Sequence, residues 1–139
     1  MNKIFFALGC LFLTQIALAM PVTIKVTNTG YQEGQIVLAV FNSRASYESS
    51  KAFKQAIVKL SASVGEGEVQ LDLPPGDYMV TTFFDTNFDK ILNTRFGIPR
   101  ERFGASNNPQ NLGAPAYDYC LVRFDDQNQK ISIKLRKIF

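Results

Sequence analysis

Residues 74–108 read PPGDYMVTTFFDTNFDKILNTRFGIPRERFGASNN, and the other segments of the chain are best interpreted from this stretch outward. It opens at residues 74–76 with a turn signal, because proline presets φ and glycine supplies a positive φ. Residues 78–84 follow as an apolar strand rich in β-branched and aromatic side chains. The segment 85–115 is then unusually long for a loop in a compact domain, which is typical of functional loops. The glycines and prolines along it predict a defined path.

Short strand-like segments flank this stretch on both sides. Residues 22–26 alternate apolar and polar side chains, as a half-buried strand does, and residues 35–41 are apolar on both faces, as in a central strand. Further strands are predicted at 56–61, 68–73, 116–125 and 130–136. The strand at 116–125 is expected to place Cys120, Val122 and Phe124 on one face.

About seven short strands joined by turn signals predict an all-β fold, an antiparallel β-sandwich of the immunoglobulin-like or transthyretin-like kind. The long loop would connect the fifth and sixth strands. The sequence has no tryptophan, so it lacks the Cys-Trp-Cys set of true immunoglobulin domains. A small β-barrel is the alternative fold. A short helix is suggested only after Ser49, where it would carry Ala52 and Phe53.

The N-terminus has the pattern of a secretory signal peptide over residues 1–19. A positive charge precedes an apolar run at residues 4–18, and a small-residue cleavage site follows at Ala19. The run is shorter than the roughly 20 residues of a membrane-spanning helix. An uncleaved anchor and a lipoprotein modified at Cys10 are the alternatives. We expect an exported protein, periplasmic or extracellular, in which residues 20–139 form one β-sandwich domain without a transmembrane segment.

Composition excludes several classes of chemistry. The sequence contains no histidine, which rules out histidine acid–base catalysis, serine–histidine triads and the usual zinc sites. The net charge is +3, but lysine and arginine are scattered, so we expect no nucleic-acid partner. Signal cleavage leaves Cys120 as the one cysteine, so no intramolecular disulfide can form. We expect this thiol to be buried and structural.

Oxygen-bearing side chains recur at alternate positions just after the apolar strand. Ca²⁺ prefers six to eight oxygen ligands, and calcium loops supply them at positions 1, 3, 5, 7 and 9. The predicted ligands are the side chains of Asp85, Asn87 and Asp89, the carbonyl of Ile91, and Asn93 acting through a water. The glycine and the bidentate glutamate of an EF-hand are replaced by Lys90 and Phe96.

Two interpretations of this pattern stay open. The first is a weak Ca²⁺ site, with a dissociation constant of about 0.1–1 mM, that orders the loop. In it, Glu101 could fold back as a further ligand, which spacing alone does not show. The second is a set of local turn hydrogen bonds made by Asp and Asn side chains. No other cofactor is implied.

The same stretch resembles an uncharacterised bacterial exported family, a domain of unknown function, with the pattern PPGxYAxxxxHDxNxNGxLDxxxxGxPxEGxGFSNN. The positions that agree are Pro74, Pro75, Gly76, Tyr78, Asp85, Asn87, Leu92, Gly97, Pro99, Glu101, Gly104, Ser106, Asn107 and Asn108. At six positions this chain has another residue than the pattern: Phe84 replaces histidine, Asp89 asparagine, Lys90 glycine, Asn93 aspartate, Arg102 glycine and Ala105 phenylalanine. The resemblance implies an exported β-sandwich and no established activity.

Three function classes follow. The first is a non-catalytic exported binding or interaction module whose long loop recognises a protein or a glycan. Tyr117 and Tyr119 are candidates for stacking on such a partner. The alternative is an envelope structural or assembly component that acts through exposed strand edges. A carboxylate hydrolase using Asp85 and Asp89 is the second alternative, but two acids in one short loop are a poor catalytic pair. We therefore expect no enzyme.

Overall fold

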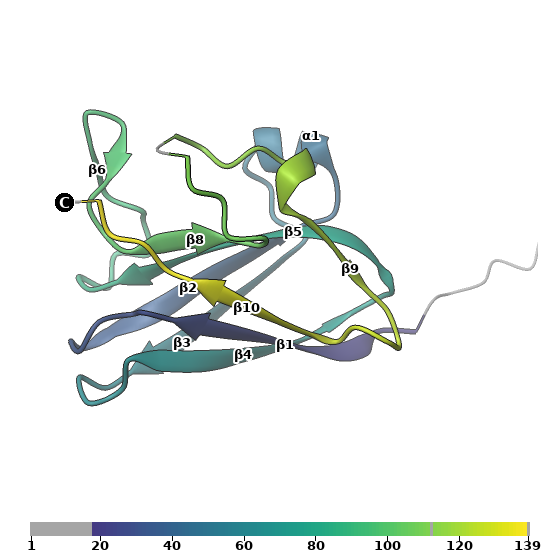
Figure 1. Ribbon diagram of the computed structural model, residues 1–139, viewed down its shortest axis with the longest axis horizontal. Coiled ribbons are helices and arrows are strands. Elements are labelled where there is room, and N and C mark those ends of the chain that lie inside the picture. The colour runs from purple at the N-terminus through teal and green to yellow at the C-terminus, as the bar shows by residue number, and fades with distance from the viewer. Residues whose placement is uncertain (1–17, 112, 139) are drawn as a thin grey trace, which may run out of the picture.

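Two β-sheets packed face to face form the body of the protein (Figure 1). The computed structural model describes residues 18–111 and 113–138, so the predicted signal peptide lies almost wholly outside the described residues. The smaller sheet has the order β10-β1-β4, with β1 (Met20–Thr27), β4 (Glu66–Leu73) and β10 (Lys130–Lys134). The larger sheet has the order β3-β2-β5-β8, with β2 (Gly34–Phe41), β3 (Lys54–Leu60), β5 (Gly76–Asp85) and β8 (Phe103–Ala105), and β9 (Leu121–Phe124) also pairs with β5. The predicted all-β sandwich is confirmed.

Strand pairing is antiparallel throughout the described chain, with one exception. The exception is β10, which pairs parallel with β1 and places Ile24 opposite Ile131. The chain reaches it after leaving β9 of the larger sheet. In the larger sheet, β2 is central and pairs antiparallel with both β3 and β5. Gln35 lies opposite Asp85 in this register, which brings two polar side chains together at one end of an otherwise apolar pair.

Side-chain alternation explains where the core lies. Val22, Ile24 and Val26 face the larger sheet and are fully buried, while the intervening residues of β1 are only partly buried. The buried side chains that form the rest of this main core are Ile36, Leu38, Val40, Val69, Leu73, Tyr78, Val80, Phe84, Phe124, Ile133 and Leu135. Both sheets contribute to it, as expected for a two-layer fold.

A second, smaller core lies on the outer face of the larger sheet. Phe41 and Met79 point outward from the sheet and pack against Ala105 and Cys120. The helix α1 (Arg44–Glu48) and the 3₁₀ turn η1 (Asp118–Cys120) lie over this face of the larger sheet (Figure 1). The expected burial of the free cysteine is therefore confirmed.

The strand predicted at 116–125 starts only at Leu121. The amide of Cys120 donates to the carbonyls of Ala116 and Tyr117, which closes a helical turn instead of continuing an extended strand. Cys120 consequently packs in the second core, whereas Val122 and Phe124 belong to the main one. The prediction that these three side chains share a strand face was wrong.

The short helix also lies earlier than predicted. Its N-cap is Ser43, whose hydroxyl accepts a hydrogen bond from the main-chain amide of Ser46. The Ser46 hydroxyl accepts one from the main-chain amide of Ser43. This reciprocal pair is a capping box, which fixes the helix start. Ser49 ends the helix, and Ala52 and Phe53 follow it. A serine-rich segment offers several equivalent caps, which is why the sequence pattern indicated the wrong one.

The long segment 85–115 does follow a defined path, and it contains strands of its own. The two-residue strands β6 (Thr94–Arg95) and β7 (Ile98–Pro99) form a small hairpin. The strand β8 then adds to the edge of β5, pairing Thr81 with Ala105. The excursion therefore returns to the sheet that it leaves (Figure 1).

The motif Ser106-Asn107-Asn108 anchors the end of this excursion. The Ser106 hydroxyl accepts from the amide of Val80 at 3.0 Å and donates to the Cys120 carbonyl. The Asn107 side-chain amide donates to the carbonyls of Tyr119 and Leu121, both at 2.9 Å. The side-chain oxygen of Asn108 accepts from the amide of Lys134 at 2.9 Å. Three consecutive residues thus connect β5, β9 and β10.

Among residues 18–111 and 113–138, no helix has the length and apolar character needed to cross a membrane.

Candidate functional site

Three carboxylates meet where β5 ends. Asp85, the last residue of β5, is fully buried, Glu101 is 9% exposed, and Asp89 is exposed. One ligand atom from each residue lies within 4.8 Å of the others. We call these three residues the acidic cluster. Two of them come from the predicted calcium loop, and Glu101 folds back to join them from the far end of the β6–β7 hairpin.

Asp85 is only half satisfied. Its Oδ2 accepts from Nε2 of the buried Gln35 at 2.8 Å and from the amide of Lys90 at 2.8 Å. Its Oδ1 is buried and has no hydrogen-bond partner among the described residues. A buried charged oxygen without a partner is costly, because it loses its hydration without compensation. Asp85 therefore brings an unsatisfied carboxylate oxygen to the residues of the acidic cluster.

Glu101 is held by main-chain donors. Its Oε1 accepts from the amide of Thr86 at 3.3 Å, and its Oε2 accepts from the amide of Asn93 at 3.2 Å. Burial raises the pKa of the Glu101 carboxyl above its ordinary value of 4.5, the two amide hydrogen bonds oppose this shift, and the nearby Asp85 and Asp89 add to it. The charged form of Glu101 is thus less favoured than in an exposed glutamate, and a positive charge in the cluster would oppose that shift.

Asp89 is stabilised in its charged form by local donors. Its Oδ1 accepts from the amide of Ile91 at 2.9 Å, and its Oδ2 accepts from the side-chain amides of Asn87 and Asn93, both at 3.0 Å. The Ile91 amide, followed by the side-chain amide of Asn93, lowers the pKa of the Asp89 carboxyl below its ordinary value of 3.8. The turn hydrogen bonds of the second interpretation are therefore present alongside the acidic cluster.

The predicted ligands divide into two groups. Asp85 and Asp89 lie in the acidic cluster, whereas Asn87 and Asn93 present their nitrogens to Asp89. The Ile91 carbonyl accepts from the side-chain amide of Asn93 at 3.2 Å. A rotation of either asparagine amide by 180° would exchange nitrogen for oxygen and offer a neutral ligand.

Sequence reasoning missed Gln35, although it is the polar residue at the start of an apolar central strand. Its side chain is buried and its amide nitrogen donates to the Asp85 carboxylate. A buried glutamine needs a polar partner, so its presence in such a strand was a usable signal.

The loop around Asp89 contains residues in a strained backbone conformation. Phe88, Lys90 and Phe96 have φ angles of 58°, 61° and 51°. This left-handed region favours glycine, which is the residue that the family pattern has at position 90. Strain of this kind persists only where surrounding contacts impose it, and the Lys90 amide is held by Asp85.

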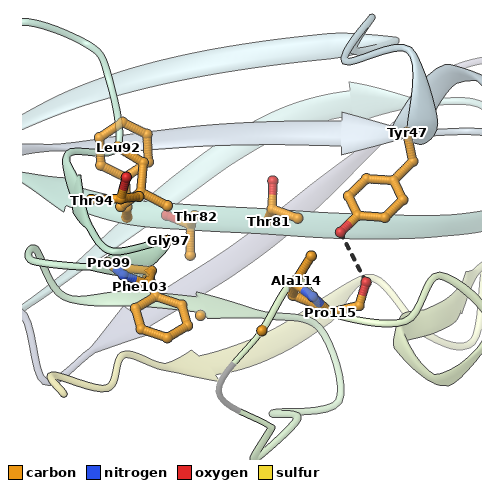
Figure 2. A pocket seen from close by; sticks show the side chains of 13 residues that line it. Tyr47, Thr81, Thr82, Leu92, Thr94, Gly97, Pro99, Phe103, Ala114 and Pro115 are labelled. Carbon is orange, nitrogen blue, oxygen red and sulfur yellow. Dashed lines mark hydrogen bonds between the residues drawn. The ribbon is translucent and has the colours of Figure 1, made fainter.

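An apolar pocket lies between the acidic cluster and the second core. Its volume is about 370 Å³, and none of the described residues that line it is charged. Figure 2 shows Leu92, Thr94 and Pro99 at one end of the pocket and Tyr47, Ala114 and Pro115 at the other. The Tyr47 hydroxyl donates to the Pro115 carbonyl at 2.9 Å, which links the two walls at that end (Figure 2).

Exposed apolar side chains occur on the same excursion. Phe96 at the tip of the β6–β7 hairpin is 90% exposed, Ile91 is 63% exposed, and Phe88 is 44% exposed. Of the two candidate tyrosines, Tyr119 is 61% exposed, whereas Tyr117 is half-buried and stacks on Tyr47 with ring centroids 6.3 Å apart.

Fold and site together define a two-sheet β-sandwich in which one long excursion covers the outer face of the larger sheet. The family described as "Uncharacterized protein conserved in bacteria (DUF2141)" matches residues 24–132, and the chain belongs to this family. The matched segment reaches from β1 to β10 and includes the whole excursion. No curated protein and no solved structure matches the chain. The expected membership of an uncharacterised bacterial family is thus confirmed.

Proposed function

We propose that the protein is an exported binding module in which a Ca²⁺ ion, held by the acidic cluster, fixes the loop that forms one wall of the apolar pocket. One observation carries the proposal above the others. The Oδ1 of Asp85 is buried without a partner among the described residues, and Asp85 itself lies in a cluster with two further carboxylates. A divalent cation would satisfy that oxygen and offset the repulsion among the three acids.

The chemistry of the donors favours calcium among the common cations. The acidic cluster offers carboxylate oxygens and the flanking residues offer amide and carbonyl oxygens, which suit a hard cation. The sequence has no histidine, and the one described cysteine is buried in the second core, so the ligands typical of zinc are missing. Flexible ligand number and geometry are tolerated by Ca²⁺ better than by Mg²⁺.

The loop that would hold the ion continues directly into the pocket wall. Asn93, whose side chain contacts Asp89, is flanked by Leu92 and Thr94, and both of these line the pocket. The Asn93 carbonyl also accepts from the amide of Arg100 at 2.8 Å, which ties the base of the β6–β7 hairpin. Ordering this loop would therefore order the pocket.

The pocket favours an apolar group of a partner protein. Its lining is apolar apart from threonine and tyrosine hydroxyls, so it offers little to a charged group or to the many hydroxyls of a sugar. The exposed Phe88, Ile91 and Phe96 offer further apolar surface on the same excursion. The N-terminal signal pattern supports a function outside the cytoplasm.

Thermal unfolding with calcium and with chelator tests the ion. At about 1 mM calcium, a dissociation constant of about 0.1–1 mM corresponds to about 0.4–1.4 kcal/mol of stabilisation. We expect calcium to raise the Tm of the wild type by a few degrees, and to leave the Tm of the double variant Asp85→Asn, Glu101→Gln unchanged.

The matched control is Asp126→Asn, which removes an exposed acid from a turn outside the acidic cluster. It should respond to calcium as the wild type does. Equal shifts in the wild type and the double variant, or no shift in either, would contradict the proposed site. In chelator, Asp85→Asn should be at least as stable as the wild type, because it removes a buried carboxylate that has hydrogen-bond partners at only one of its two oxygens.

A further inference from the structure

A second polar feature lies at the C-terminal end of β10. It is a cleft of about 560 Å³ between that strand, the turn at Asn28 and the segment that follows Asn108. We call it the basic cleft, because its charged residues are Arg102, Lys134, Arg136 and Lys137, and no acidic residue is among the described residues lining it.

These four cations are not neutralised by the described part of the chain. Lys25, Arg44, Arg123 and Lys130 each form an ion pair with a described acid, whereas the cations of the basic cleft form none within 4.0 Å. Glu101 lines an adjoining hollow with Arg102 and Lys137, but it directs its oxygens to main-chain amides. Four like charges around one cleft repel one another unless an anion joins them.

Arg102 supplies the observation that points to a ligand. Its Nε is buried and has no hydrogen-bond partner among the residues described, so a strong donor is left unused. Its guanidinium lies against Gly30, where an added Cβ would come within 3.1 Å of Nε. Gly30 has a φ of 86°, which also favours glycine. The turn at Gly30 therefore leaves room for this guanidinium.

The neutral side chains of the basic cleft hold its walls in place. The side-chain amide of Asn28 donates to the Leu135 carbonyl at 2.7 Å, and the side-chain oxygen of Asn108 accepts from the main-chain amide of Lys134 at 2.9 Å. Arg136 donates to the Asn111 carbonyl at 2.6 Å, with its guanidinium 5.1 Å from the ring centroid of Phe103. The main chain that forms the cleft walls is thus held in place, and Arg136 is fixed beside it.

We propose that the basic cleft binds a phosphate group, either free or as a phosphate monoester. Guanidinium and ammonium groups are the side chains that proteins use for phosphate oxygens, and the planar guanidinium can donate two parallel hydrogen bonds. A dianion matches four surrounding cations better than a singly charged carboxylate does. The ligand is carried by a soluble molecule or by a lipid headgroup, since both present the same monoester.

Calorimetric titration of residues 20–139 tests the proposal. Inorganic phosphate and glycerol phosphate are the probes, acetate is the monoanion control, and chelator keeps the acidic cluster free of calcium. The double variant Lys134→Gln, Lys137→Gln should bind phosphate at least about tenfold more weakly than the wild type, because it loses two charged contacts. The double variant Lys51→Gln, Lys59→Gln removes the same charge from exposed positions outside the basic cleft and should bind as the wild type does.

Co-sedimentation with vesicles separates the two sources. Vesicles of phosphatidylcholine with phosphatidic acid present the lipid monoester, and vesicles of phosphatidylcholine alone are the control. Binding of glycerol phosphate without vesicle binding supports a soluble ligand. Binding of phosphatidic acid vesicles by the wild type, lost in the Lys134→Gln, Lys137→Gln variant, supports a headgroup. Absence of binding in both experiments, or equal weakening by both double variants, would overturn the proposal.

Arg102→Lys tests the buried guanidinium with the charge retained. We expect weaker phosphate binding, since lysine lacks the paired donors of the planar guanidinium, and thermal unfolding verifies that the variant is folded. Undiminished binding by folded Arg102→Lys would contradict the role assigned to this side chain. All titrations are made without calcium, so failure of the Ca²⁺ proposal would leave this result standing, and the reverse holds as well.

Discussion

Glu101 shows how a single residue links the acidic cluster to pH. Its carboxylate is nearly buried, receives two main-chain hydrogen bonds and lies near two other acids. Burial is the largest cause of its raised pKa. The folded protein without an ion therefore holds the Glu101 proton more tightly than the unfolded chain does, whereas a bound cation would compete with that proton.

The stability contribution of Glu101 should change sign with calcium. In chelator, this residue makes the protein more stable as pH falls from 7 toward the ordinary value of 4.5, because the folded state binds more protons than the unfolded state. In saturating calcium, the same acidification should lower stability, because protonation releases the ion. Urea unfolding at several pH values measures both slopes.

Glu101→Gln is the reference, since it removes this titration and one ligand. Subtracting its pH profile isolates the contribution of Glu101 from that of Asp89, whose lowered pKa costs stability only below about 3.8. Parallel slopes for the wild type in chelator and in calcium would rule out an ion that depends on Glu101.

Lys90 offers a second test at the residue scale. Its φ of 61° strains a lysine by about 1–2 kcal/mol, and glycine relieves that strain at an entropic cost of about 0.5–1 kcal/mol. We therefore expect Lys90→Gly to be stabilised by about 0–1.5 kcal/mol in chelator. It should also bind calcium severalfold more tightly, because a positive charge is lost from the loop. Chemical unfolding and calcium titration measure the two effects.

Lys90→Ala separates strain from charge. It removes the ammonium group but keeps a Cβ in the left-handed region, so it should gain calcium affinity without gaining stability. A stabilisation equal to that of Lys90→Gly would show that backbone strain at this position is not the cause.

At the scale of elements, the motif at residues 106–108 determines how the excursion rejoins the sandwich. It connects β5, β9 and β10, and thereby holds β8 against β5. The strand β8 has only three residues and brings Glu101 and Arg102 to their positions just before it. The acidic cluster and the basic cleft both depend on this one anchor.

Asn107→Ala should cost about 1–3 kcal/mol of unfolding free energy. It removes two side-chain hydrogen bonds to main-chain carbonyls and places alanine at a φ of 62°. Asn107→Gly loses the same hydrogen bonds without the backbone strain, so the difference between the two variants measures that strain. A cost below about 0.5 kcal/mol for Asn107→Ala, the range of ordinary surface substitutions, would show that the anchor is dispensable.

For the whole molecule, the sandwich was predictable because strand alternation is a local signal. Val22, Ile24 and Val26 alternate with polar residues in the sequence and are buried in the structure as that pattern requires. The start of the helix was predicted wrongly, because Ser43 and Ser49 both resemble caps and the local capping box between Ser43 and Ser46 was overlooked. Cys120 was predicted to be buried, but a 3₁₀ turn moved it to the second core.

The acidic cluster was predictable only in part. Asp85 and Asp89 are close in sequence, so their spacing indicated a shared loop. Glu101 reaches them because the β6–β7 hairpin reverses the chain, and spacing contains no information about such a return. The basic cleft was missed for the same reason, since Arg102 and Lys134 are distant in sequence and meet only through β8 and β10.

The parallel pairing of β1 with β10 has a consequence for how the chain acquires its structure. Thr23 pairs with Lys130, so the smaller sheet requires a contact between distant parts of the chain. Closing so large a loop is entropically expensive, which makes assembly of that sheet a late and slow event. A chain still emerging from the ribosome would lack the β10 side of that sheet until residue 134 is made. Until then, β1 would present the unpaired edge that β10 later covers.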